Sequence, residues 1–329
     1  MLKTSHLQEE ICADPLLYDA HLPLAQTFHP IGHAVEIRSN SVDVLAAAAK
    51  LWGRYPVLSH AEPIRIRVIA GTSRSSSSRD PRPPRGEGHL FSIAHGVDDF
   101  ALADLSAGFA FASLSQYSVS NPSYLCYHFL EPLAYAMLAT RHFVLLHASC
   151  ISRNHNAIVL CGDSGAGKTC LAYACAKRGW EFVSGDAVQV VRGSSNRLVI
   201  GRPYEIRFRE SARELFPELN LSRAGFRANG KIDLEIDTSQ LDIPTALQGL
   251  ARHIVFIEQG SATRIEKFPL QSALWKFEET ICYGDDKTRL QQWETLRHFV
   301  GLPIWRLCFS DLDQAEHTLN WLLDEESKC

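Results

Sequence analysis

The chain lacks several features that would place it in a special class of protein. Its nine cysteines contain no Cys-x-x-Cys pair, so we expect reduced, mostly buried thiols and no cysteine metal site. It has no excess of basic charge, since the net charge is −4 and the pI is about 6.4, so no nucleic-acid partner is expected. The length of 329 residues and a hydrophobic content of 46% predict a globular protein with two domains.

Long uncharged apolar runs are also missing. The most apolar stretch, residues 124–151, is interrupted by charged side chains such as Glu131 and Arg141, which argues against a membrane span. Residues 1–6 read MLKTSH and contain no apolar segment of the kind found in a secretory signal. We therefore expect a cytoplasmic protein with no membrane partner.

One motif stands out against this ordinary background. The sequence contains a complete G-x-x-x-x-G-K-[ST] phosphate-binding loop, formed by Gly162, Asp163, Ser164, Gly165, Ala166, Gly167, Lys168 and Thr169. The apolar run 157–161 predicts a buried strand before it, and residues 170–178 predict a helix after it, closed by Gly179. Strand, glycine-rich loop and helix in this order are the context of a true P-loop.

The chemistry of such a loop points to a nucleoside triphosphate. Its backbone N–H groups curl around the phosphates, and the helix N-terminus adds partial positive charge. Lys168 would reach the β- and γ-phosphates, and the Thr169 hydroxyl would bind Mg²⁺. The expected cofactors are therefore ATP, or another nucleoside triphosphate, and Mg²⁺. The tetrapeptide at 162–165 also occurs around the nucleophile of trypsin-like proteases, but here it leads into Gly167-Lys168-Thr169 and a helix, which excludes that alternative.

The N-terminal half predicts an α+β domain that ends near residue 120. Strands are expected at 34–38, 64–69, 90–93, 100–105 and 107–114, with a helix at 42–52. Residues 71–89 are rich in Ser, Arg, Pro and Gly and predict a flexible loop. Its four arginines fit either a solvated loop or a docking site for an acidic peptide or nucleic acid.

The C-terminal half, residues 121–329, predicts an α/β domain. A long helix is expected from Pro122 to about Ala139, with a kink at Pro132. Asn229-Gly230 signals a hairpin turn, and the apolar run 254–257 is typical of a strand covered on both faces. The other expected strands are 144–149, 158–161, 181–184, 188–191, 198–200 and 304–308, and the other helices are 210–215, 286–300 and 312–323.

The residues around the P-loop occur in an order that resembles a known family. His147 stands before the loop, Lys177-Arg178-Gly179 ends the next helix, Phe182-Val183-Ser184-Gly185-Asp186 follows, and then Glu205-Ile206-Arg207. This series, between about 140 and 210, resembles the catalytic domain of the HPr kinase/phosphorylase family. The N-terminal half is more like the divergent HPr-kinase-related proteins found with bacterial peptide-tailoring enzymes, some of which phosphorylate a serine on a precursor peptide.

The resemblance implies a P-loop kinase core of the HPr-kinase C-terminal type, behind an α+β N-terminal domain. The implied activity is transfer of the γ-phosphoryl group to a serine hydroxyl of a peptide or protein, which the N-terminal domain would help to recognise. Asp186 matches the second aspartate of the family's V-A-D-D, Glu205 the glutamate of E-I-R, and His147 the histidine near the reacting phosphate. A homo-oligomer is compatible with the sequence.

Two departures from the family pattern affect the expected activity. Gly185 stands where the family has its first aspartate, so one carboxylate is missing. We also find no counterpart of the C-terminal P-G-R-type loop, which argues against phosphorolysis. A small-molecule kinase and a nucleotide-binding regulator with little transfer activity therefore stay open beside the serine kinase.

Residue roles also stay open at this point. Thr169 with Asp186 or Glu205 would supply oxygen ligands to Mg²⁺, and Asp186 or His147 would act as the base. Arg207, with Arg209 on the same face of an alternating segment, would contact phosphate or substrate, or form a surface ion pair. Arg227 and Lys231 flank the expected hairpin and are further candidates for a phosphate contact.

Overall fold

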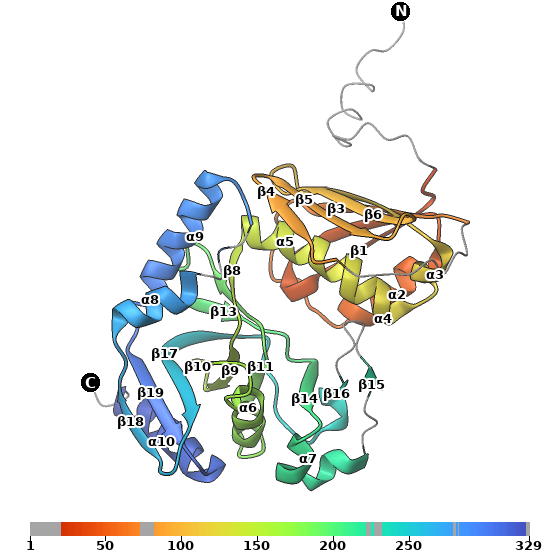
Figure 1. Ribbon diagram of the computed structural model, residues 1–329. Helices are drawn as coiled ribbons and strands as arrows, with labels where there is room; N and C mark the ends of the chain where they lie inside the picture. Colours follow the sequence, from red (N-terminus) through yellow and green to blue (C-terminus); the bar gives the residue numbers. More distant parts are fainter. Residues whose placement is uncertain are drawn as a thin grey trace, which may run out of the picture. The chain divides into compact units, whose positions relative to one another are not determined.

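The chain folds into two compact units. The computed structural model describes residues 21–72, 82–221, 225–226, 232–278, 281 and 283–326 (Figure 1). The first unit comprises Met1–Arg141 with Tyr283–Arg289, and the second comprises His142–Cys282 with Leu290–Cys329. Of the residues discussed above, Arg74, Arg79, Arg227, Lys231 and the Asn229-Gly230 turn lie outside the described residues.

The first unit is built on a seven-stranded mixed sheet. The strand order is β1-β2-β3-β7-β6-β5-β4, with β2–β3 and β3–β7 parallel and the other pairs antiparallel. This confirms the expected mixture of strands and helices. The strands are β1 Leu24–Phe28, β2 Val35–Ser39, β3 Ile64–Ala70, β4 Arg85–Glu87, β5 Leu90–His95, β6 Asp99–Asp104 and β7 Phe109–Leu114.

The strand β4 corrects the expectation of an unbroken flexible loop over 71–89. Arg85–Glu87 pairs with Leu90–Ser92 of β5 in an antiparallel hairpin. Its three residues are exposed, so the pairing rests on backbone hydrogen bonds, which side-chain composition does not reveal.

Helices of the first unit pack on this sheet. Helix α2 (Val42–Trp52) contacts β1 and β2, and it begins at Ser41, whose side chain accepts a hydrogen bond from the Asp43 N–H. A short helix α3 (Gln116–Val119) precedes the expected long helix. That helix is present in three pieces, α4 (Pro122–Leu125), a π-helical turn (Cys126–Leu130) and α5 (Glu131–Arg141).

The break in the long helix has a local cause. Pro132 has no N–H to donate and its ring crowds the preceding turn, and the wide turn immediately before it accommodates both effects. Helix α5 packs on β3 and β6, so it belongs to the first unit. The boundary therefore falls after Arg141 rather than near residue 120.

The second unit contains a nine-stranded mixed sheet. The order is β11-β9-β10-β17-β13-β12-β8, and β19 pairs with both β17 and β18. The strands β10, β17 and β19 are parallel neighbours. The strands are β8 Phe143–Leu146, β9 Ser149–Arg153, β10 Asn156–Cys161, β11 Glu181–Ser184, β12 Val188–Val191, β13 Leu198–Ile200, β17 Gln248–Gln259, β18 Arg264–Lys267 and β19 Ile304–Phe309.

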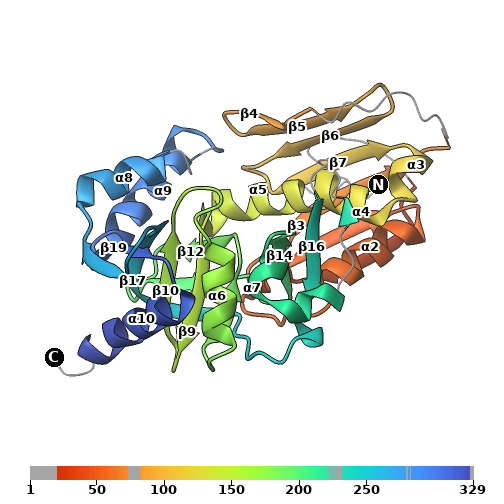
Figure 2. The same ribbon diagram turned by 60° about the horizontal axis from the view of Figure 1, so that its bottom comes forward.

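Both faces of this sheet are covered. Ile158 and Leu160 of β10 belong to one apolar core with residues of α6 (Lys168–Ala176) and α10 (Leu312–Glu326). Val159 and Cys161 belong to the other, with residues of α8 (Leu270–Glu278) and α9 (Asp286–Phe299). This double burial explains the continuous apolar runs 157–161 of β10 and 254–257 of β17. Figure 2 shows α6 lying along β9 and β10.

A small antiparallel sheet completes the second unit. It has the order β14-β16-β15, with β14 at Glu205–Arg209, β15 at Gly225–Phe226 and β16 at Ile232–Asp237. Ile206 and Phe208 of β14 are buried against α6, and the alternate positions of the strand carry charged side chains. Two short helical segments, α7 (Ala212–Leu215) and Pro217–Leu221, lie between β14 and β15 along the chain, and a third, Thr238–Gln240, follows β16.

The expected single strand 144–149 is wrong, because the chain changes partners there. Strand β8 pairs with β12, whereas β9 pairs with β10 and β11. His147 and Ala148 lie in the break, where the Ala148 N–H donates to the Leu146 carbonyl over 3.0 Å. His147 is thus exposed at a turn rather than inside a strand.

Candidate phosphate-binding site

The P-loop residues connect β10 to α6 in the second unit. They leave the sheet at the carboxyl end of β10, beside its parallel neighbour β17, which is in turn parallel to β19. Ligands of α/β proteins bind at this edge of a sheet. The first turn of α6 begins at Gly167, whose carbonyl accepts a hydrogen bond from the Leu171 N–H over 2.8 Å. Strand, loop and helix therefore occur as the sequence predicted.

Glycine is required at the two ends of the loop for different reasons. A Cβ atom on Gly162, which has φ +149°, would lie 2.7 Å from the Ile257 carbonyl oxygen of β17. Gly167 has φ +94°, in the left-handed region, and directly precedes α6. The first glycine lets the loop leave β10 against its neighbour, and the last turns the chain into the helix.

Lys168 is folded back into the loop. Its side chain is buried, and Nζ donates to the carbonyl oxygens of Gly162 at 2.7 Å and Asp163 at 3.2 Å. Burial lowers the pKa of Lys168 below its ordinary 10.5, against the opposing effect of Asp163 and Asp186. Arg209 adds to the lowering because it is a second positive charge nearby. The site is therefore one where positive charge is already costly and an anion would be stabilised.

Thr169 is joined to the turn that follows β11. Its Oγ1 donates to the Gly185 carbonyl over 2.9 Å, and the Ser149 hydroxyl donates to the same oxygen. A Cβ atom on Gly185 would have only ordinary contacts, the nearest at 3.4 Å, and would lie 3.9 Å from Thr169 Oγ1. A side chain would therefore fit here beside the Thr169 hydroxyl, so packing does not require the glycine.

Asp186 and His147 lie next to each other beside this turn. The Asp186 backbone carbonyl lies 3.0 Å from His147 Nδ1, which donates in the tautomer that carries its proton there. Asp186 is also close enough to Lys168 to raise the pKa of that lysine. The structure thus places four of the predicted site residues together, namely Lys168, Thr169, Asp186 and His147.

Glu205 and Arg207 are engaged with each other. Arg207 Nε forms an ion pair with Glu205 and lies 3.5 Å from Glu235 Oε2 on β16. The structure thus gives Arg207 the ion-pair role that the sequence left open beside a phosphate contact. The residue of β14 that contacts the P-loop is Arg209, through a 2.8 Å hydrogen bond from its guanidinium to Ser164 Oγ.

Two further residues near the loop come from other parts of the chain. Lys276 of α8 lies 3.3 Å from the Asp163 carboxylate, although 113 positions separate them in the chain. Ser149 holds the Gly185 carbonyl from a neighbouring strand. No local pattern marked either residue, whereas the alternation in 205–209 did mark Arg209.

The donors available fit a magnesium–nucleotide complex better than a metal held by protein alone. Among the described residues, no group of three or more His, Cys, Asp or Glu side chains is placed to hold a metal ion. Mg²⁺ keeps several water and phosphate oxygens and needs only one or two protein ligands. The hydroxyl of Thr169 and a carboxylate such as Asp186 or Glu205 are oxygen donors of the required type.

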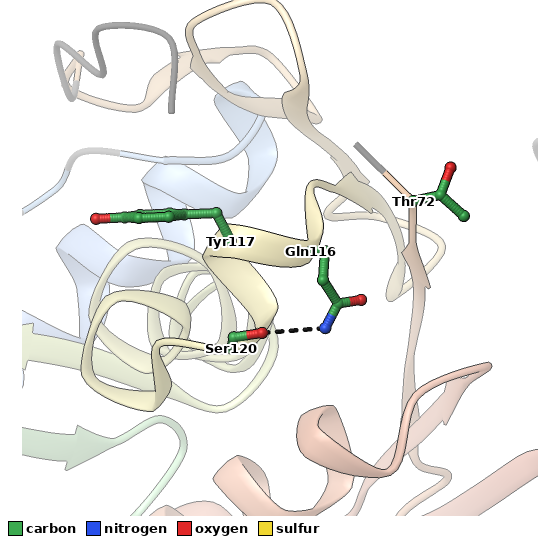
Figure 3. Close-up of a pocket in the computed structure, with 4 residues that line it drawn as sticks. All are labelled: Thr72, Gln116, Tyr117 and Ser120. Carbon is green, nitrogen blue, oxygen red and sulfur yellow. Dashed lines mark hydrogen bonds between the residues drawn. The ribbon is translucent and has the colours of Figure 1, made fainter. Parts of the chain in front are cut away.

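The first unit has a separate pocket of about 530 Å³. Thr72, Gln116, Tyr117 and Ser120 line it, and the Gln116 amide donates to Ser120 Oγ over 3.0 Å (Figure 3). None of these four side chains carries a charge, so the pocket offers no counterpart of the phosphate-binding loop. In the part of the chain that the structure describes, no helix is long and apolar enough to cross a membrane.

Comparisons with known proteins give little beyond this geometry. No protein-family model and no curated protein matches the chain. Among solved structures, the chain is similar to the Hpr(Ser) kinase/phosphatase from Coxiella burnetii, with 12% sequence identity and a TM-score of 0.28. The similarity covers 55% of this chain and 98% of that one. The TM-score is too low to establish a common fold.

Proposed function

We propose that this protein is a kinase that uses ATP and Mg²⁺ to phosphorylate a serine hydroxyl on a peptide or protein. The observation that carries the proposal is the buried Lys168 ammonium inside a glycine loop, at the carboxyl ends of three parallel strands. A cation in that place, surrounded by backbone N–H groups at a helix N-terminus, favours a bound polyphosphate.

The residues near the loop suit phosphoryl transfer, which depends mainly on positioning and charge neutralisation. Lys168 would leave the loop carbonyls to bind β- and γ-phosphate oxygens. Mg²⁺ would supply further positive charge there, with Thr169 and Asp186 or Glu205 as its protein ligands. As the serine oxygen bonds to the γ-phosphorus and the bond to the bridging oxygen breaks, Asp186 or His147 would accept the hydroxyl proton.

Recognition of the acceptor is assigned to the first unit. A nucleotide site needs only the second unit, and the first adds a complete sheet and its helices. The arginines at 82 and 85 would suit an acidic or phosphorylated segment. A peptide or protein is therefore favoured over a small molecule.

A second candidate function rests on Gly185. The position beside Thr169 has room for a side chain, yet it carries no carboxylate. A protein that binds the nucleotide and transfers phosphate slowly or not at all would need fewer carboxylates. We therefore keep a nucleotide-dependent regulator as the alternative.

The substitution Lys168→Ala tests the proposal. We expect it to abolish Mg·ATP binding in calorimetry and phosphorylation of candidate serine peptides in mass spectrometry, because it removes the cation at the β/γ-phosphates. The fold should survive, since the removed charge is a desolvated one. Lys50→Ala, the same change on an exposed lysine of α2, should alter neither.

The outcomes separate the candidates. Unchanged ATP affinity in Lys168→Ala would refute the nucleotide site. ATP binding by the wild-type protein without any phosphorylated product would favour the regulator. Label on small molecules, but on no peptide, would refute the assigned acceptor.

A further inference from the structure

Arg209 is the cation of the second unit that reaches the P-loop from the small sheet. It is the last residue of β14, and its guanidinium donates to Ser164 Oγ over 2.8 Å. Nη1 of the same group would lie 3.2 Å from a Cβ atom built on Gly165. The guanidinium therefore lies against the middle of the loop, where a larger residue than glycine would crowd it.

The electrostatics of the loop suggest that this arrangement is made for an anion. Arg209 lowers the pKa of Lys168, so in the free protein the two cations repel each other. Bringing two positive charges to one loop is unfavourable unless a negatively charged ligand lies between them. A polyphosphate held by the loop would reverse the sign of that interaction.

The partner of Arg209 also differs from those of the neighbouring cations. Arg207 is paired with Glu205 and Glu235, and Lys276 with Asp163. Arg209 donates instead to a neutral hydroxyl. A hydrogen bond to a hydroxyl is weaker than one to an ionised oxygen, so a phosphate oxygen would compete well for this guanidinium.

We propose that Arg209 is a phosphate-binding residue of the nucleotide site. When a nucleoside triphosphate enters, the guanidinium leaves Ser164 Oγ and donates to phosphate oxygens, so that Arg209 and Lys168 hold the polyphosphate together. The planar guanidinium can donate two parallel hydrogen bonds, which a lysine ammonium cannot imitate. This inference rests on the proposed nucleotide site and adds an arginine that reaches the loop from β14.

The test compares four variants of the full chain by calorimetry with Mg·ATP and with inorganic tripolyphosphate. Arg209→Gln should lower the affinity for both ligands by about tenfold or more, which is the usual effect of losing hydrogen bonds to a charged group. Arg209→Lys should recover only part of the loss. Arg252→Gln is the matched control, because Arg252 is an exposed arginine bonded to Asn156 at the other end of β10, and its affinity should stay within twofold of the wild type.

Ser164→Ala distinguishes phosphate binding from a purely structural role. If Arg209 only pins the loop through Ser164, removing either partner should have the same effect on affinity. If Arg209 binds phosphate, Arg209→Gln should weaken binding far more than Ser164→Ala does. The slope of affinity against salt concentration should also become shallower in Arg209→Gln alone, because one ionic contact is lost.

Three results would overturn the inference. Equal losses in Arg209→Gln and Ser164→Ala would reduce Arg209 to a loop support. Affinities of Arg209→Gln within twofold of those of Arg252→Gln would exclude a phosphate contact while leaving the proposed function intact. No binding of either ligand by the wild-type protein would refute both the nucleotide site and the role of Arg209.

Discussion

The positive charge of Lys168 lies in a buried environment that destabilises it. Burial lowers its pKa, and the carboxylates of Asp163 and Asp186 offset that effect only in part. Burial raises the pKa of the neighbouring Cys161 thiol to about 12, so this group is neutral at pH 7. The ammonium instead donates hydrogen bonds to two loop carbonyls. Oxygen atoms of a bound phosphate would take the place of these carbonyls as acceptors.

This environment predicts that nucleotide binding takes up a proton at alkaline pH. In the free protein, part of Lys168 is already neutral at a pH somewhat below 10.5, because its pKa is lowered. Phosphate oxygens raise that pKa again, so the bound form holds more protons and the affinity falls as pH rises through the lowered pKa. Calorimetry in buffers of different ionisation enthalpy measures this uptake.

Binding at pH 7 provides the internal control for Lys168, because its ammonium is more fully protonated before binding there than at alkaline pH. Protons exchanged there come from other groups, such as the phosphates. If the heat of binding has the same buffer dependence at alkaline pH as at pH 7, the titrating lysine is not in contact with the phosphates.

At the scale of single residues, what the sequence could predict depends on separation along the chain. Residues 162–169 form their loop locally between β10 and α6, as the sequence predicted, whereas the contacts of Lys168 with phosphate and of Thr169 with Mg²⁺ stay predictions. Lys276 reaches the same loop across 113 positions, and only tertiary folding brings it there. Arg207 and Arg209 share one face of β14, but the pattern alone could not tell which of them touches the loop.

At the scale of elements, the junction of β10 with the loop depends on a close approach of two backbones. We predict that Gly162→Ala destabilises the protein and weakens nucleotide binding, because the new methyl group would lie 2.7 Å from the Ile257 carbonyl. Gly179→Ala is the matched control, since Gly179 has φ +85° but open space around a Cβ atom. It should lose about 1 kcal/mol from backbone strain alone.

The free energy of unfolding of both variants, measured with denaturant, distinguishes backbone strain from a steric clash with the Ile257 carbonyl. Gly162→Ala should lose clearly more stability than Gly179→Ala and should also lose ATP affinity, whereas the control keeps its affinity. Equal destabilisation of the two would mean that the loop moves away from β17 without difficulty.

The hydrophobic pattern of the sequence predicted the elements that bury a regular set of apolar side chains. It failed where the hydrogen-bonded partner of a strand determines the bounds of that strand. Strands such as β10 and helices such as α2 follow from their apolar spacing. The division between β8 and β9 does not, because residues 143–151 are mostly apolar on both sides of His147 while the strand partners change. All three residues of β4 are exposed, so only its backbone pairing defines it.

At the scale of the whole molecule, the position of α5 determines where the chain can be cut. Leu133, Met137 and Leu138 of α5 are buried, and the helix packs on strands of the first unit. We predict that a chain beginning at Pro122 is less soluble and binds a hydrophobic dye more strongly than one beginning at His142. The two chains differ only by the segment that contains α5, so equal solubility and dye binding would show that α5 does not need the first unit's sheet.

The assignment of Tyr283–Arg289 to the first unit has a consequence for how the protein is made. The Tyr283 ring packs edge-on against Phe91 of β5, with ring centroids 5.1 Å apart. On the ribosome, β5 is synthesised long before Tyr283, and at 5–20 residues per second the delay is on the order of ten seconds. During that interval the Phe91 ring lacks its contact with the Tyr283 ring, so the packing of the first unit is completed only after residue 283 has been synthesised.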